Sequence, residues 1–293
     1  MFKKFILGIW NVGIIEKDVK DILDGGQFKI RWLKHGYRDR FFADPFLYDA
    51  DDKYYYILAE EMPFFSQYGY ISLLKVDKST MRLVEKARVL EDGAHHSYPF
   101  VREDKSFIPE NYATGECVAY KLDDNNVALK SELVMDKGLI DQTFLFFDGK
   151  EWVFATDEDN PLFGLKIFYR EIGESEWHEH ALNPVKSDIK SSRPGGHFFT
   201  VGDKLYRPVQ DSEVRYGHKI RIMMVDKLSP TEFSEHEVAV FSAENDKPFN
   251  LGLHTFNAEK GFIVVDGYKE RHSFIIKSLC VKCPNFMKRI SKQ

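Results

Sequence analysis

A short hairpin pattern occurs five times along the chain and constrains its fold more than any other feature. The first copy is ADPFLYDADDKYYYIL at residues 43–58, in which the acidic Asp44 precedes Pro45. An apolar run follows, then a turn-forming cluster, then a second run rich in aromatic and β-branched residues. This order is typical of two β-strands joined by a tight turn.

The later copies keep the same order of a polar start, an aromatic-rich run, a turn and a second run. We expect the five hairpins near residues 42–60, 96–111, 140–156, 192–210 and 251–268. Their aligned phenylalanines, Phe46, Phe100, Phe144, Phe198 and Phe256, are spaced by 54, 44, 54 and 58 residues, with the register open by one residue at the third and fourth copies. Repeats of this length, each able to form four short strands, are typical of β-propeller blades. The sequence therefore predicts an all-β, five-bladed β-propeller that fills residues 1–293 as one domain.

The remaining segments fit this architecture. The apolar run from Phe5 to Ile15 is interrupted by Asn11 and is shorter than the ~20 residues that span a bilayer, so we expect a first strand that could close the ring. Only the segment from Lys17 to Leu23 resembles a helix, and it is short. A pair of β-sandwiches is the alternative fold, but it would not explain five similar hairpin starts.

Composition narrows the class of protein. Apolar residues make up 43% of the 293 residues and charged residues 30%, as in soluble globular proteins. The net charge of −5, without a long basic block, argues against a nucleic-acid partner. The chain has three cysteines and no small-residue cleavage site after its first apolar run, which favours the cytoplasm. Cys280 and Cys283 form a CxxC pair without a second pair, so we predict no metal and no cofactor.

The polar residues at the hairpin starts are the candidate site. In a propeller the innermost strand of every blade begins at one rim of the central channel, so these residues converge although they are far apart in sequence. Glu110, at the end of the second hairpin, is placed with them, and Glu60 and Glu61 stand at the equivalent end of the first. Exposure is the simpler expectation for each, and it is stronger for Glu61 than for Glu110. A polar pocket of this kind suits a polar ligand. The converging residues are Asp44, His95, His96, Tyr98, Asp141, Arg193, His197 and His254.

A second group of polar residues surrounds the fourth start. Residues 192–197, SRPGGH, contain two glycines that let the backbone approach a ligand closely. Arginine can bind a carboxylate or phosphate through two hydrogen bonds, which would suit an acidic or nucleotide-linked sugar. The nearby polar residues are Arg207, Gln210, Asp211 and Tyr216.

Several of these motifs, in this order, resemble the N-terminal domain of glucosamine inositolphosphorylceramide transferases and its stand-alone bacterial relatives. The resemblance runs from about Ile30 to Val240, and Asn111 and Gln142 depart from it. The motifs are FADPF (42–46), HHSYPFV (95–101), FIPEN (107–111), SRPGG (192–196), LYRPVQD (205–211) and the pair Tyr216-Gly217.

The resemblance implies a propeller like that of glycoside hydrolase family 43, and bacterial members are associated with surface-polysaccharide metabolism. Those hydrolases use a blade-one Asp as base, a blade-three Asp as modulator and a blade-four Glu as acid. Asp44 and Asp141 match the first two, but Arg193 stands where the acid is expected. Glu110, from another blade, could supply the acid. The family's transferase reaction is not implied, because a separate domain carries it.

Three hypotheses follow. In the first, the protein is a glycosidase or transglycosylase acting on a surface-glycan sugar or its precursor, with Asp44, Glu110 and Asp141 in catalytic roles and the other polar residues binding substrate. In the second, it is a non-catalytic glycan-binding propeller of a polysaccharide-assembly pathway. The third and weakest is a glycosyltransferase, because Asp157-Glu-Asp159 resembles a metal-binding DxD motif. Whether the protein is an enzyme is left open between the first two, with the enzyme slightly favoured.

Overall fold

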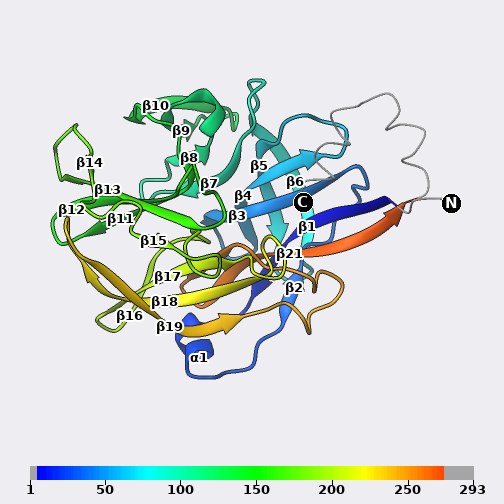
Figure 1. The fold of residues 1–293 in the computed structure, drawn as a ribbon. Helices are drawn as coiled ribbons and strands as arrows, with labels where there is room; N and C mark the ends of the chain where they lie inside the picture. Colours follow the sequence, from blue (N-terminus) through cyan, green and yellow to red (C-terminus); the bar gives the residue numbers. More distant parts are fainter. Residues whose placement is uncertain (1–4, 274–293) are drawn as a thin grey trace.

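Five β-sheets arranged around one axis form the protein (Figure 1). The computed structural model describes residues 5–273. Four of the sheets have four strands and the third has five. The prediction of an all-β, five-bladed propeller is confirmed.

Blades 1 to 4 follow the chain, each beginning with its innermost strand. Blade 1 contains β3 (Arg40–Ala50), β4 (Tyr54–Pro63), β5 (Tyr70–Asp77) and β6 (Arg82–Leu90). Blade 2 contains β7 (Ser97–Val101), β8 (Phe107–Glu110), β9 (Cys117–Leu122) and β10 (Ala128–Met135), with a 3-10 turn at Tyr112–Thr114. Blade 3 contains β11 (Ile140–Phe147), β12 (Lys150–Thr156), β13 (Gly164–Glu171), β14 (His178–Glu179) and β15 (Lys186–Ser187). Blade 4 contains β16 (Phe199–Val201), β17 (Lys204–Asp211), β18 (Lys219–Leu228) and β19 (Phe233–Phe241).

Blade 5 is built from the two ends of the described chain. Its inner strands are β20 (Phe256–Glu259) and β21 (Phe262–Ser273), and its outer strands are β1 (Phe5–Ile15) and β2 (Ile30–Trp32). β1 pairs with β21 along its whole length, from Phe5 opposite Ser273 to Ile15 opposite Ile263. The short helix α1 (Val19–Leu23) lies between β1 and β2. The expected N-terminal strand is therefore present, and it closes the ring.

The inner strands of blades 1, 2 and 3 share one irregularity. Their pairing slips between Ala43 and Phe46, between Ser97 and Phe100, and between Ile140 and Thr143. Within each slip one non-glycine residue has a positive φ: Asp44 at 48°, Tyr98 at 41° and Asp141 at 50°. These conformations are uncommon for residues with a side chain, and a bulge of this kind redirects the side chain it carries. The bulges also make Thr143, and not Phe144, equivalent to Phe46 and Phe100.

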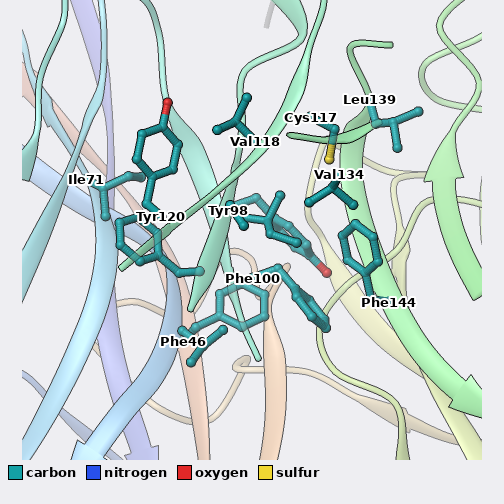
Figure 2. Packing of buried hydrophobic residues seen from close by; sticks show 14 of the residues in the cluster. Phe46, Ile71, Tyr98, Phe100, Cys117, Val118, Tyr120, Val134, Leu139 and Phe144 are labelled. Carbon is teal, nitrogen blue, oxygen red and sulfur yellow. The ribbon is translucent and has the colours of Figure 1, made fainter. Parts of the chain in front are cut away.

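The apolar core lies between adjacent blades and continues into the centre of the ring. Phe46, Tyr98, Phe100 and Phe144 pack against one another where blades 1, 2 and 3 meet (Figure 2). His197, from the start of blade 4, contacts the rings of Phe46 and Phe100 edge-on. This aromatic packing fills the centre and gives the site above it a floor.

The structure also bears on the expected exposure of Glu61 and on the question of a membrane-spanning segment. Glu61 is fully buried and not exposed, because Arg40 and Lys86 pair with its carboxylate and the Ser72 hydroxyl donates to it at 2.6 Å. The Cys280–Cys283 pair lies outside the described residues. Within residues 5–273, no helix has the length and apolarity needed to cross a membrane.

Candidate functional site

One half of the candidate site is a buried chain of side chains from blades 1 and 5. The Thr255 hydroxyl lies 3.1 Å from Asp44 Oδ1, and His254 Nε2 lies 3.5 Å from the same oxygen. His254 Nδ1 forms an ion-pair contact with Asp266 Oδ2. The other oxygen of Asp266 accepts the backbone N–H groups of His254 and Thr255 at 2.9 and 3.0 Å. Both contacts to Asp44 thus fall on Oδ1, and the described residues make no hydrogen bond to Oδ2.

Burial and charge shift the proton affinities of this chain. Burial raises the pKa of Asp44 to about 6, and Asp266 and Asp141 add to the increase while His254 opposes it. Burial alone would lower the pKa of His254, but the carboxylates of Asp266 and Asp44 raise it to about 9. His254 is therefore an imidazolium at neutral pH, and Asp44 is ionised only above about pH 6.

The His254 ring is enclosed by its neighbours. Trp10, from β1, stacks on it with centroids 3.9 Å apart and planes 13° apart. Tyr216 meets it edge-on at 5.5 Å. Gly217 has a φ of +62°, and a Cβ on it would lie 2.8 Å from both His254 and Trp10. The ring can face only the two carboxylates that flank it.

The other half of the site joins blades 2, 3 and 4. Arg193 Nε forms an ion pair with Asp141 Oδ2 at 2.5 Å. The Arg193 guanidinium also donates to Pro161 O at 3.0 Å and to the Tyr216 hydroxyl at 3.3 Å. Glu110 Oε2 accepts the backbone N–H of Asp141 at 3.1 Å. Burial and the charge of Asp141 raise the pKa of Glu110 well above its usual value, which favours the protonated form of this carboxyl.

Charge interactions link the two halves of the site. Asp141 raises the pKa of both Asp44 and Glu110, so its carboxylate lies within electrostatic range of each. The grouping of Asp44, Glu110 and Asp141 around a shared pocket stays a prediction.

Asp44, His254 and Asp266 have ligating atoms within 4.8 Å of one another, which is compact enough for a metal ion. The internal contacts argue against that use. Asp266 already accepts three backbone N–H groups, and the buried His254 ring lies between the two carboxylates. The positive charge between the two carboxylates is therefore supplied by the His254 imidazolium and not by a metal ion.

The predicted residues Arg207, Gln210 and Asp211 lie behind the pocket. Arg207, with 1% of its side chain exposed, donates to the carbonyls of Ser191 and Ser192 and pairs with Glu235 at 2.7 Å. The backbone N–H of Gln210 donates to the Arg193 carbonyl at 2.9 Å, and its side-chain amide donates to the Pro194 carbonyl at 2.8 Å. Asp211 pairs with Arg221 at 2.7 Å. Four consecutive carbonyls, 191–194, are thus held, which fixes the backbone that carries Arg193.

The other predicted residues have mainly structural contacts. His197 Nε2 lies 2.8 Å from the Val101 carbonyl across the ring, and burial lowers the pKa of His197 to about 4, so it is neutral. The Tyr98 hydroxyl lies 2.8 Å from Thr143 Oγ1, and its ring is fully buried. His95 Nδ1 accepts the Gly69 N–H at 2.8 Å in front of blade 1. His96 is buried and contacts Asp92 at 2.8 Å.

Sequence reasoning missed Trp10, Thr255 and Asp266. Asp266 is detectable in principle, because FIVVDGY places one acidic residue inside an apolar strand, where an isolated charge is costly. Trp10 has no comparable signal, because tryptophan in an apolar strand is ordinary core composition. The DxD-like segment is also explained without a metal, since Asp157 pairs with Lys166 at 2.8 Å.

Two glycines with nearly the same φ allow a matched test of this packing. Gly217→Ala is expected to destabilise the fold by about 2–4 kcal/mol, because the added Cβ meets both His254 and Trp10. Gly202→Ala, at φ +65° with nothing within 4 Å of its Cβ, is expected to cost only about 1 kcal/mol. Urea unfolding followed by fluorescence measures both. Equal losses would show that Gly217 serves only its backbone conformation.

Comparison with known proteins identifies relatives of the chain. The sequence model of the family described as glucosamine inositolphosphorylceramide transferase 1, N-terminal, matches residues 31–258. A glucosamine inositolphosphorylceramide transferase 1 from Oryza sativa subsp. japonica is 30% identical over 256 residues, which is 81% of this chain and 31% of the relative. The protein of the same description from Arabidopsis thaliana is 29% identical over 257 residues, 83% of this chain and 31% of the relative. The chain therefore spans about a third of the length of these relatives.

Solved structures with a similar fold include two glycoside hydrolases. A GH43_1 enzyme from Xanthomonas citri has a TM-score of 0.50 at 12% identity and covers 80% of this chain and 89% of its own. A family 117 glycoside hydrolase from the marine bacterium Zobellia galactanivorans has the same TM-score and identity, over 83% of this chain and 89% of its own. At this identity the similarity shows the fold.

Proposed function

Because the chain belongs to the family of the N-terminal domain of glucosamine inositolphosphorylceramide transferases, we propose that it is a carbohydrate-active protein that cleaves or transfers a glycosyl group. The observation that carries this proposal is the unequal environment of three neighbouring carboxyls. Asp141 is paired with Arg193, burial raises the pKa of Asp44 to about 6, and burial beside Asp141 raises the pKa of Glu110 well above its usual value. Glycoside chemistry requires a carboxyl that keeps its proton as the acid and another that ionises as base or nucleophile.

Each carboxyl has a role that its contacts support. Glu110, which is partly exposed to the pocket, donates its proton to the oxygen of the breaking glycosidic bond. Asp44 acts through Oδ2, either by attacking the anomeric carbon or by taking a proton from the attacking water or hydroxyl. Asp141, held by Arg193 and by the Thr156 hydroxyl at 3.3 Å, orients substrate and keeps Glu110 protonated. The acid thus comes from blade 2, because Arg193 occupies the blade-four position.

The charges favour a neutral or cationic sugar at the reacting position. The arginines once expected to bind an acidic or nucleotide-linked sugar are already paired, Arg193 with Asp141 and Arg207 with Glu235. A carboxylate or phosphate on the sugar would meet Asp44 and Asp141, and the arginines beside them in the described part of the chain are already paired. Exposed aromatic residues from the equivalent loops of blades 2, 3 and 4 surround the mouth and can stack on sugar faces. They are Tyr112, Phe163 and Tyr216, exposed by 48%, 46% and 37%.

The second candidate is a glycan-binding module without catalysis. The observation in its favour is the tight pairing of Asp141 with Arg193, since a carboxylate in an ion pair needs no reaction to explain it. Neither Asp44 nor Glu110 is paired with an arginine, and that difference favours the enzyme. A place in surface-polysaccharide metabolism and a cytoplasmic location are part of the proposal and rest on the resemblance and on composition.

The proposal is tested by measuring aryl-glycoside hydrolysis and transfer across a panel of neutral sugars as a function of pH. We expect kcat/KM to rise with pH through about 6, as Asp44 loses its proton, and to fall at higher pH as Glu110 loses its own. Binding of panel sugars, measured by calorimetry, without turnover at any pH would support the binding module.

A further inference from the structure

Asp266 is a buried carboxylate that the proposed chemistry does not use, yet it receives the densest set of contacts near the pocket. It is fully buried in β21. Its oxygens accept the backbone N–H groups of His254, Thr255 and Asp44, at 2.9, 3.0 and 3.3 Å, as well as the Thr255 hydroxyl at 3.1 Å. It also contacts the His254 ring. A charge buried at this cost and bonded on every side stabilises one arrangement of its neighbours.

We propose that Asp266 and His254 form a positioning pair, in which Asp266 fixes the ring and the charge of His254 and His254 holds the Asp44 carboxylate with Oδ2 toward the pocket. This inference rests on the proposed function for the role of Asp44. It replaces the expectation that His254 binds substrate, because the ring faces carboxylates on both of its nitrogens.

Hydrogen-bond stoichiometry supports the pair. The Thr255 hydroxyl lies 3.1 Å from Asp44 Oδ1 and 3.1 Å from Asp266 Oδ2, but a hydroxyl has one proton to donate. When Asp44 and Asp266 are both ionised, the Thr255 hydroxyl donates its proton to one of them. Its oxygen lone pair then faces a lone pair of the other carboxylate. The imidazolium between the carboxylates offsets that repulsion. If His254 loses its charge, protonation of Asp44 removes this repulsion, because the carboxylic acid can donate a hydrogen bond to the Thr255 hydroxyl oxygen.

The remaining charges that face Asp44 do not replace His254. Asp141 raises the pKa of Asp44 and so works against its ionisation. Arg193 is paired with Asp141, and the phenol of Tyr98 stays neutral because burial raises its pKa well above its usual value. His254 is therefore the cation next to Asp44 among the described residues.

Proton titration followed by NMR tests the pair without any substrate. In protein labelled with 15N-histidine, the His254→Gln variant identifies the His254 signals among the ten histidines. We expect the His254 ring to stay protonated through neutral pH in the unaltered protein and to titrate near pH 9. In Asp266→Asn the midpoint should fall by at least one pH unit, a tenfold loss of proton affinity. Asp246→Asn, which removes a blade-five carboxylate bonded to the Ile30 N–H, is the matched control and should leave the midpoint unchanged.

A second variant keeps the test decisive if Asp266→Asn does not fold. Asp44→Asn removes the carboxylate on the other side of the His254 ring. It should lower the His254 midpoint by less than Asp266→Asn does. Ordinary titration of His254 near pH 6.5 in the unaltered protein, or a midpoint unmoved in every variant that folds, overturns the positioning pair. Once a substrate is known, His254→Gln should move the acidic limb of kcat/KM to higher pH. If the protein shows no turnover but the His254 midpoint shifts as expected in the variants, the proposed function is rejected and the positioning pair is retained.

Discussion

Replacing Asp44 by Asn is expected to lower turnover of a confirmed glycoside substrate by about 10³-fold or more, because the amide can neither attack nor accept a proton. Replacing Glu110 by Gln is expected to cost about 10²- to 10⁴-fold on substrates with a poor leaving group. The second loss should be much smaller for aryl glycosides whose leaving group departs without protonation. Steady-state kinetics on both substrate types separates the base or nucleophile from the acid.

Two exposed carboxyls provide matched controls for these variants. Asp203→Asn and Glu103→Gln make the same chemical changes at exposed turn positions and should leave turnover unchanged. Unchanged turnover in both Asp44→Asn and Glu110→Gln would show that the catalytic assignment is wrong. A loss in Asp44→Asn alone, with Glu110→Gln fully active on every substrate, would require another acid.

Replacing Arg207 by Ala is expected to give the largest loss of stability, about 3–5 kcal/mol, because it leaves the buried Glu235 without one of its two cationic partners. Lys186, at 2.7 Å from Glu235, compensates in part. The same change releases the carbonyls of Ser191 and Ser192, so Arg193 should also lose its fixed position and kcat/KM should fall.

Urea unfolding of Arg207→Ala measures the first effect. Arg215→Ala is the control, because Arg215 is 38% exposed and forms only a 3.5 Å pair with Glu270, a kind of contact worth at most about 1 kcal/mol. A loss below about 1 kcal/mol for Arg207→Ala would mean that the positions of the Ser191 and Ser192 carbonyls do not depend on Arg207. Lower kcat/KM with unchanged stability would instead assign Arg207 to substrate binding.

The fold and the centre of the site could be predicted because both follow from periodicity. A repeat of about fifty residues forces equivalent positions to one rim, so Asp44 and Asp141 are found without knowledge of any contact. The bulges that turn these side chains inward were not predictable, since Asp and Tyr at positive φ leave no distinct pattern in the sequence.

Pairing within and between blades is what the sequence could not show. Arg207 and Glu61 look like exposed or ligand-binding charges until Glu235, Arg40 and Lys86 are placed beside them. His197 looks like a rim residue, but its ring lies among aromatic side chains in the centre of the propeller. In each case the partner is distant in the chain, and residue type alone does not identify it.

The pairing of β1 with β21 also constrains the order of folding. β1 is synthesised about 250 residues before its partner β21, whose paired residues run from Ile263 to Ser273. Until then β1 has only its short pairing with β2 at residues 13–15, and the rest of it is an unpaired apolar strand, which is prone to association with other chains. Trp10 lies on this strand and His254 near the other end of the described chain, so their stacking forms only when the ring closes. A nascent or misfolded chain therefore cannot assemble this pocket before blade 5 is complete, and slow, non-local folding is the cost of building a site from both ends of the ring.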